Sequence, residues 1–467
     1  MTDLHLPLDP AAGRLSAQLA AGLRAAVRDG RLAGGTRLPS SRDLARDLGV
    51  SRGVVVTAYE QLVAEGFLVS RRGDGTRVAP LARPDLPPLR SAPVWPDEEP
   101  AARAGTSPCD LRPGPDLSAF PRELWAAAIR TALRTIPSDA LSYPEPSGAA
   151  ELRGELAGYL GRVRAAHAVP ERIVVMNGVA HVISSVVRLL AAAGHTVLAV
   201  EDPSGHRQPP MLEAAGVGLV RIPVDAHGID VAALAASPAR AVLVTPAHQY
   251  PTGVVLAPGR RAELIQWARA VNGLVIEDDY DAEFRYDRSP VGCLQGLAPE
   301  RVVLAGSVSK SLAPALRLGW AVVPASLAER LRMHRMNTDI GGPVLEQHAL
   351  AHLLASGAYD RHLRAMRRRY RARRDALAGA LAARLPDVRV QGVAAGLHLY
   401  VELPAGCDEE KVVAEAAHHG LLLQGAAPMW SRPAKPALVI GYARVNETRL
   451  RSAVDILDRV IARGIHG

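Results

Sequence analysis

Hydrophobic positions that recur every four residues near the start of the chain predict a group of short helices. Leu15–Arg28 places three leucines and a valine at this spacing, so the segment is expected to form a helix with one apolar face. Ser40 or Ser41 stands where it can cap a second, shorter helix. Ser51 can cap a third helix, which runs to about Glu65. The candidates for burial on that third helix are Val54, Val55, Ala58, Leu62 and Val63.

Two short apolar runs follow and predict a β-hairpin. Phe67–Ser70 and Thr76–Val78 are separated by a polar, glycine-containing turn over residues 71–75. Helix, short turn, second helix and hairpin make up the winged helix-turn-helix arrangement, whose second helix presents its N-terminus to the major groove. The first eighty residues are therefore expected to read DNA.

Strand-like apolar runs alternate with helical segments from Asp110 onward. Continuous β-branched runs separated by helices indicate a mostly parallel sheet that is buried on both faces, so an α/β fold is predicted here. Ligands of such sheets bind at the carboxyl ends of the strands. The predicted strands are Arg172–Met176, Thr196–Val200, Ala241–Val244, Gly273–Ile276, Arg301–Leu304 and Gly319–Val323.

A proline-rich stretch separates the two patterns. Residues 80–108 carry eight prolines and little periodic apolar character, which is typical of an extended, semi-rigid linker. We predict a DNA-binding domain over residues 1–79, a linker over 80–108 and a large second domain over 109–467.

Composition narrows the class of protein. The formal net charge of +8 weakly favours a polyanionic partner. No apolar run is long enough for a membrane span, no secretory signal precedes the first helix, and the expected location is the cytoplasm. Cys109, Cys293 and Cys407 lie too far apart in sequence for a metal-binding or CxxC spacing, which agrees with a reducing compartment.

Lysine is rare in this chain, which makes each lysine informative. Only three of the 55 basic residues are lysines, namely Lys310, Lys411 and Lys435. Arginine cannot form a Schiff base, so a lysine that is not replaced by arginine is a candidate for amine chemistry. Lys310 follows a predicted strand and has Ser307, Ser309 and Arg317 close by in sequence. A lysine amine can bind pyridoxal phosphate as a Schiff base, while hydroxyls and an arginine hold the phosphate.

Other strand ends carry complementary groups. Asp278 ends one predicted strand and can hold a pyridine nitrogen protonated, and the phenol of Tyr280 can donate to the ring oxygen. Gly178 opens a helix directly after another strand, where free backbone N–H groups can bind phosphate.

The N-terminal unit resembles the GntR family of winged-helix repressors. The resemblance rests on Arg37-Leu38-Pro39-Ser40-Ser41-Arg42-Asp43-Leu44-Ala45 followed by Gly49-Val50-Ser51-Arg52. It implies double-stranded operator DNA as the partner. Where relatives have a third basic contact on the recognition helix, this chain has Val56. The DNA-contacting residues implied by position are Arg42, Ser51, Arg52, Arg72 and Gly73.

The C-terminal unit resembles fold-type-I aminotransferases, and the whole chain resembles the MocR/GabR subgroup of GntR regulators. Four motifs carry this resemblance in the expected order: Tyr143–Gly148, His248–Gly253, Glu277–Asp281 and Ser307–Leu312. It implies pyridoxal 5'-phosphate as cofactor, a smaller C-terminal α+β subdomain and a head-to-tail homodimer. Lys310 would then carry the Schiff base. The other residues that the resemblance places at the cofactor are Asp278, Tyr280, Gly178, Val179, Ala180, Ser307, Ser309, Arg317, His248, Tyr250 and, from the neighbouring subunit, Tyr143.

Two departures from the family pattern leave alternatives open. Where relatives stack an aromatic ring on the pyridine, this chain has Ser204-Gly205-His206, so either His206 stacks or the ring is held less tightly. Where aminotransferases set an arginine for the substrate carboxylate, this chain has Val439. A missing carboxylate contact would favour a simple amine, or the cofactor itself, as the ligand. Arg432, Arg444 and Lys435 are nearby alternatives for an effector contact.

These observations lead to a transcription regulator that senses an amine, an amino acid or pyridoxal phosphate itself through Lys310. One alternative is an active aminotransferase that carries a DNA-binding appendage. Another is a DNA-binding protein whose large domain has lost the cofactor and only dimerises.

Overall fold

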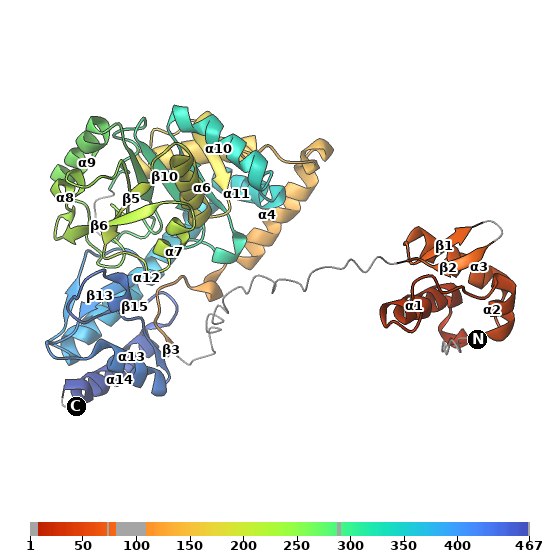
Figure 1. Ribbon diagram of the computed structural model, residues 1–467. Helices are drawn as coiled ribbons and strands as arrows, with labels where there is room; N and C mark the ends of the chain where they lie inside the picture. Colours follow the sequence, from red (N-terminus) through yellow and green to blue (C-terminus); the bar gives the residue numbers. More distant parts are fainter. Residues whose placement is uncertain (1–7, 72–73, 81–108, 287–290, 466–467) are drawn as a thin grey trace. The chain divides into compact units, whose positions relative to one another are not determined.

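A computed structural model describes residues 8–71, 74–80, 109–286 and 291–465 of the chain (Figure 1). The chain divides into two compact units, residues 1–103 and 104–467. The predicted linker falls almost entirely outside the described residues, as do Arg72 and Gly73 of the predicted hairpin turn. The domain boundaries given above therefore stay predictions.

The first unit has the predicted order of helices and strands. Its helices are α1 (Leu15–Arg28), α2 (Ser41–Asp47) and α3 (Arg52–Ala64), and its hairpin pairs β1 (Leu68–Arg71) with β2 (Gly75–Val78). The apolar face of α1 packs on α3 through Leu19 and Leu23, which are fully buried. Val63 was predicted to be buried, but it is 38% exposed, because the buried stripe of α3 runs through Val55, Ala58 and Leu62 instead.

A single eight-stranded sheet forms the centre of the second unit. The strand order is β4-β11-β10-β9-β8-β5-β6-β7. Neighbours pair in parallel except where β11 meets β4 and β10 and where β7 meets β6. The mostly parallel sheet that the apolar runs predicted is thus confirmed. The strands are β4 (Ile173–Met176), β5 (Val197–Asp202), β6 (Gly218–Asp225), β7 (Gly228–Ile229), β8 (Ala241–Val244), β9 (Leu274–Asp278), β10 (Val302–Ser307) and β11 (Gly319–Val322).

Helices cover both faces of this sheet, because alternate residues of each strand point to opposite sides. On β10, Val303 packs toward α6 (Val179–Ala192) and α10 (Ala325–Thr338). The adjacent Val302 packs toward α9 (Pro258–Ala270). The remaining helices around the sheet are α4 (Arg122–Thr135), α5 (Ala150–Arg164), α7 (Gln208–Glu213), α8 (Val231–Ala235) and α11 (Val344–Ala355).

A smaller α+β subdomain completes the second unit, as predicted. Its antiparallel sheet has the order β12-β13-β15. The long helix α12 (Ala358–Arg384) packs against the last helix, α14 (Glu447–Ile465). The other elements are β3 (Cys109–Asp110), β12 (Arg389–Gln391), β13 (His398–Glu402), α13 (Glu409–His418), β14 (Leu421–Leu422) and β15 (Ala437–Gly441). Among the described residues, none of the helices combines the length and apolarity needed to cross a bilayer.

Candidate functional site

The carboxyl ends of two neighbouring parallel strands bring Asp278 and Lys310 to one cavity. Asp278 ends β9 and lies opposite Ala305 of β10, while Lys310 follows β10 by three residues. The cavity has a volume of about 420 Å³, which is within the range for a small-molecule site. Further residues predicted from the sequence that line it are Tyr280, Tyr250, His206, Val179 and Ala180.

Burial controls the charge of both groups. It raises the pKa of Asp278 to about 7, an effect that Asp279 and Asp281 reinforce. It lowers the pKa of the Lys310 amine, which the carboxylates of Asp281 and Asp278 partly oppose. Oδ1 of Asp278 is buried and has no hydrogen-bond partner among the described residues. This acceptor therefore suits a ligand that brings its own N–H donor.

A second set of predicted residues forms a cradle at the start of α6. Gly178 precedes this helix at φ 91°, and a Cβ there would lie 3.0 Å from Nη2 of Arg317. The Arg317 guanidinium donates to the carbonyl of Asn177. Gly178 and Ser307 both pack against Gly319 of β11. A helix N-terminus, a guanidinium and a hydroxyl together suit a phosphate group.

The amide of Ser309 belongs to the same turn. Its backbone nitrogen donates to Oγ of Ser307 over 3.3 Å. Ser307, the last residue of β10, is buried and Ser309 is half-buried, and neither is among the residues that line the cavity.

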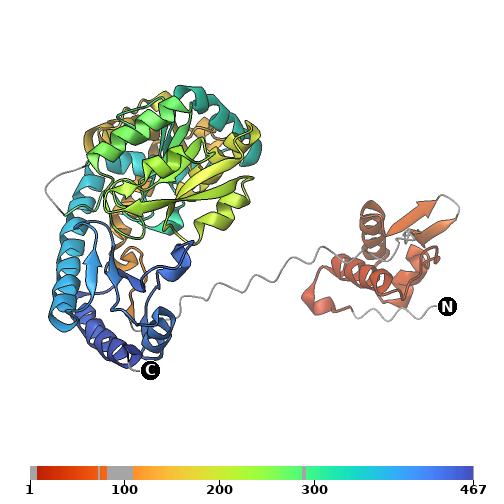
Figure 2. The same ribbon diagram turned by 60° about the vertical axis from the view of Figure 1, so that its left-hand side comes forward.

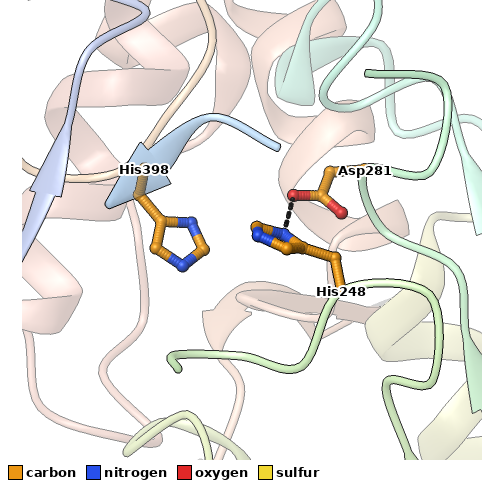
Figure 3. Close-up of side chains that lie close together, drawn as sticks. All are labelled: His248, Asp281 and His398. Atoms are coloured by element: carbon orange, nitrogen blue, oxygen red, sulfur yellow. Dashed lines mark hydrogen bonds and ion pairs between the residues drawn. The ribbon is translucent and has the colours of Figure 1, made fainter. Parts of the chain in front are cut away.

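His248, Asp281 and His398 form a buried cluster beside the cavity (Figure 3). Nδ1 of His248 lies 2.9 Å from Oδ2 of Asp281 and 3.0 Å from the hydroxyl of Tyr280. His398 comes from β13 of the smaller subdomain, and its ring centroid lies 5.1 Å from that of His248. Its Nε2 donates to the carbonyl of Pro251 over 3.0 Å, and burial lowers the pKa of its imidazole to about 3. His398 is therefore a neutral imidazole whose proton is on Nε2 and whose Nδ1 can only accept.

The same cluster has the donor types of a metal site, but its surroundings favour a hydrogen-bonded role. Nδ1 of His248 is engaged by two partners. Gly396 packs so closely that a Cβ there would lie 2.5 Å from both Oδ2 of Asp281 and Nδ1 of His248. Backbone therefore fills the side from which an ion would have to bind both atoms.

Several residues that line the cavity were not predicted from the sequence. Oε2 of Glu201, at the end of β5, accepts from the amide and hydroxyl of Thr245 at 3.1 and 2.6 Å. Burial raises the pKa of Glu201 to about 7. Arg207 and His398 also line the cavity. The sequence predicts a strand that ends at Val200, so Glu201 could have been expected at a strand end. The positions of Arg207 and His398 depend on tertiary packing.

Not every predicted contact lies at the cavity. Tyr143 is 85% exposed on the surface of the chain. Nη1 of Arg444 lies 2.6 Å from Oδ2 of Asp110. Arg432 stacks over Trp430. Val439 is fully buried in an apolar cluster with Tyr400, Ala426, Met429 and Ala437, so no cation takes the usual carboxylate position on β15.

In the first unit, the described residues predicted to contact DNA lie in α2 (Arg42) and at the start of α3 (Ser51 and Arg52). Arg42, Ser51 and Arg52 are largely accessible, and Nε of Arg52 lies 3.3 Å from Oγ of Ser41. Ser51 is the N-cap residue but makes no side-chain capping bond, so its hydroxyl is free for another partner. Ser40 does cap α2, through the amide of Asp43.

Comparison with known proteins gives two family matches. Residues 15–78 match the model of bacterial regulatory proteins of the gntR family, and residues 116–457 match that of aminotransferase class I and II. The pyridoxine biosynthesis transcriptional regulator PdxR of Corynebacterium glutamicum is 35% identical over 99% of this chain and 100% of its own length. The probable rhizopine catabolism regulatory protein MocR of Rhizobium meliloti is 31% identical over 94% of this chain and 92% of its own.

A solved aminotransferase matches the second unit. The α-aminoadipate aminotransferase LysN of Thermus thermophilus, solved with N-(5'-phosphopyridoxyl)-L-leucine, has a TM-score of 0.68 and 25% identity. The match covers 76% of this chain and 92% of LysN. The large unit therefore has the fold-type-I aminotransferase fold.

Proposed function

This chain belongs to the MocR/GabR group of gntR-family transcription regulators, and we propose that it binds pyridoxal phosphate at Lys310. A ligand in the same cavity would then change the affinity of the chain for operator DNA. The observation that carries the proposal is the convergence of Lys310, Asp278 and Tyr280 in one cavity of a chain with a DNA-binding unit.

The residues present fit the cofactor. The orphaned Oδ1 of Asp278 would accept from the pyridine nitrogen, and the Tyr280 phenol would face the ring oxygen. Arg317, Ser307 and the start of α6 would hold the phosphate. When bound, pyridoxal phosphate supplies an aldehyde that combines with primary amines. Burial favours the neutral form of the Lys310 amine, which is the nucleophilic form.

The DNA-binding half of the proposal rests on the first unit. Arg42, Ser51 and Arg52 would contact phosphates or base edges, and Arg72 and Gly73, which lie outside the described residues, would extend the contact. The expected assembly is a homodimer, which would present two such units to a two-part operator.

The regulatory half requires a difference in affinity. A ligand shifts DNA binding only if it binds one conformation more tightly than the other. Pyridoxal phosphate itself is one candidate ligand, which the pyridoxine-related name of the PdxR relative favours. An amine or amino acid that meets the cofactor in the cavity is the other candidate.

The three lysines allow a clean test. Purified chain is titrated with pyridoxal phosphate, and the imine absorbance band is followed in wild type, Lys310→Ala and Lys435→Ala. The band is expected in wild type and in Lys435→Ala, since Lys435 is exposed, and lost in Lys310→Ala. A band that is absent from wild type, or unchanged in Lys310→Ala, contradicts the cofactor assignment.

Operator binding is then measured with and without the cofactor. A duplex from the region upstream of the chain's own gene serves as the DNA. Ligand-dependent affinity is the expected result. Sustained turnover of amino acids and keto acids without any effect on DNA binding would favour the aminotransferase alternative.

A further inference from the structure

The long helix α12 carries a stripe of arginines on its exposed face. Arg361, Arg364, Arg368 and Arg371 follow one another at intervals of three, four and three residues, and all four are exposed. This spacing places them on one side of an α-helix. Figure 2 shows α12, in light blue, along one side of the large unit. The opposite face of the helix packs into the core through Leu363, Met366, Tyr370, Leu377 and Leu381.

Internal contacts do not account for this arginine stripe. Within the described part of the chain, no carboxylate lies within ion-pair distance of Arg364, Arg368 or Arg371. Other arginines of the same helix behave differently, since Arg369 and Arg373 both pair with the buried Asp116. The stripe also lies outside the lining of the cavity at Lys310. Its charge is therefore available to an external anion.

Several unpaired charges in a row match an extended polyanion better than a small ligand. The stripe covers eleven residues of helix, from Arg361 to Arg371, or about 15 Å between its ends at a rise of about 1.5 Å per residue. Duplex DNA carries about one negative charge per 1.7 Å of its axis, so four guanidiniums along this length can each meet a phosphate. The first unit of the same chain matches a DNA-binding family, which makes DNA the polyanion already at hand.

We propose that the arginine stripe of α12 contacts the sugar–phosphate backbone of DNA that flanks the operator. This rests on the proposed function, because the first unit must bring the duplex to the protein. The contact adds affinity without sequence information, as phosphate contacts do.

The test compares two triple variants of the full chain. Arg364→Ala/Arg368→Ala/Arg371→Ala removes the stripe, and Arg188→Ala/Arg240→Ala/Arg330→Ala removes the same charge from exposed positions elsewhere. Affinity for the upstream duplex is measured by fluorescence anisotropy over a range of salt concentrations. Each lost phosphate contact lowers the slope of log affinity against log salt by about 0.9. For the stripe variant, the slope of log affinity against log salt should be smaller by about 2 to 3. The variant should also bind at least about tenfold more weakly at low salt, while the control keeps the wild-type slope.

DNA length gives a second readout. Duplexes that extend beyond the operator should bind wild type more tightly than a minimal site does, and the stripe variant should lose this gain. An unchanged slope in the stripe variant, or an equal loss in the control, overturns the proposal. A change of oligomeric state in the stripe variant, measured by light scattering, also overturns it, because the stripe would then bind a second copy. Failure of wild type to bind any upstream duplex would instead contradict the proposed function itself.

Discussion

Oδ2 of Asp281 lies 2.9 Å from Nδ1 of His248, and both side chains are almost fully buried beside the cavity. Gly396, close in sequence to β13, packs directly against this pair, so the smaller subdomain and the large sheet meet here. The same carboxylate acts on Lys310, whose pKa it raises against the effect of burial. Asp281 thus raises the pKa of Lys310 and also takes part in the contact between the large sheet and the smaller subdomain.

Asp281→Asn should lower the pKa of Lys310 further, because it removes the larger of two opposing carboxylate effects. The variant should also lose about 1–3 kcal/mol of stability, since a buried charge-assisted hydrogen bond is weakened. Reductive methylation with labelled formaldehyde and NMR titration of the lysine methyl groups measures this pKa in the protein without cofactor.

The chain supplies its own reference signals for that titration. Lys411 and Lys435 are exposed and lie near Asp408 and Glu402, so their methyl signals serve as references against which a change at Lys310 is measured. An unchanged Lys310 titration, or one displaced to higher pH, would show that Asp281 does not act on the amine.

Strand positions were predictable from the sequence where strands are buried on both faces. Ala241–Val244 is β8 as predicted, because each of its residues is apolar and buried. β6 was not predicted, since Gly218–Asp225 contains an arginine and a proline and is only partly buried near the edge of the sheet. A local pattern reports burial, so the fully buried edge strand β4 was predicted, whereas β6, which is only partly buried, was not.

Site residues were predictable where they follow such strands. Asp278 and Lys310 stand at strand ends, and parallel pairing of β9 with β10 brings them to one edge. Arg207 and His398 were missed for different reasons. One arginine among many carries no signal of its own, and His398 reaches the cavity only because a strand from the smaller subdomain packs against the large sheet.

Asp278 and Glu201 should each contribute stability to the cofactor-free protein that is lost as pH rises from about 4 to about 7. Burial raises the pKa of Asp278 and of Glu201 to about 7 in the folded state, whereas both carboxyls ionise near their ordinary values when unfolded. The folded state therefore binds more protons in this range, and its advantage is complete below pH 4 and lost as pH rises through 7. The loss is on the order of 3 kcal/mol per group. Urea unfolding at a series of pH values measures it.

Asparagine and glutamine test which groups are responsible. Asp278→Asn and Glu201→Gln should each remove one such loss from the pH profile, so that stability at pH 7 relative to pH 4 is higher than in wild type, while Glu213→Gln, an exposed position, should leave the profile unchanged. A profile that keeps its full slope in the double variant would assign the effect to other buried acids, such as Glu277.

Arg207 should decide whether carboxylates are accepted in the cavity. Val439 leaves the usual arginine position apolar, and Arg207 is the guanidinium that lines the cavity among the described residues. Arg207→Gln should weaken binding of amino acids about tenfold or more, because a charge-assisted hydrogen bond contributes about 1.5–3 kcal/mol. Binding of amines that lack the carboxylate should stay unchanged. Isothermal calorimetry with alanine and ethylamine compares the two classes.

The control for this prediction is Arg389→Gln, which removes an exposed arginine on β12. It should bind both ligands as wild type does. Equal affinity of wild type for the amine and the amino acid would mean that no residue of the cavity recognises a carboxylate.

Arg52 should contribute one phosphate or base contact to operator binding. It begins α3, is exposed, and lies 3.3 Å from Ser41 of α2, so its guanidinium is held at the point where the two helices meet. Arg52→Ala should weaken operator binding by about tenfold and lower the salt slope by about 1 if the contact is to phosphate. If the contact is to a base edge, affinity falls for the operator but not for unrelated duplexes, and the salt slope stays as in wild type.

Arg31→Ala, which changes an exposed arginine of the same unit that pairs with Asp29, is the matched control for Arg52→Ala. Binding by Arg52→Ala that equals wild type on both duplexes would remove the start of α3 from the DNA-contacting surface.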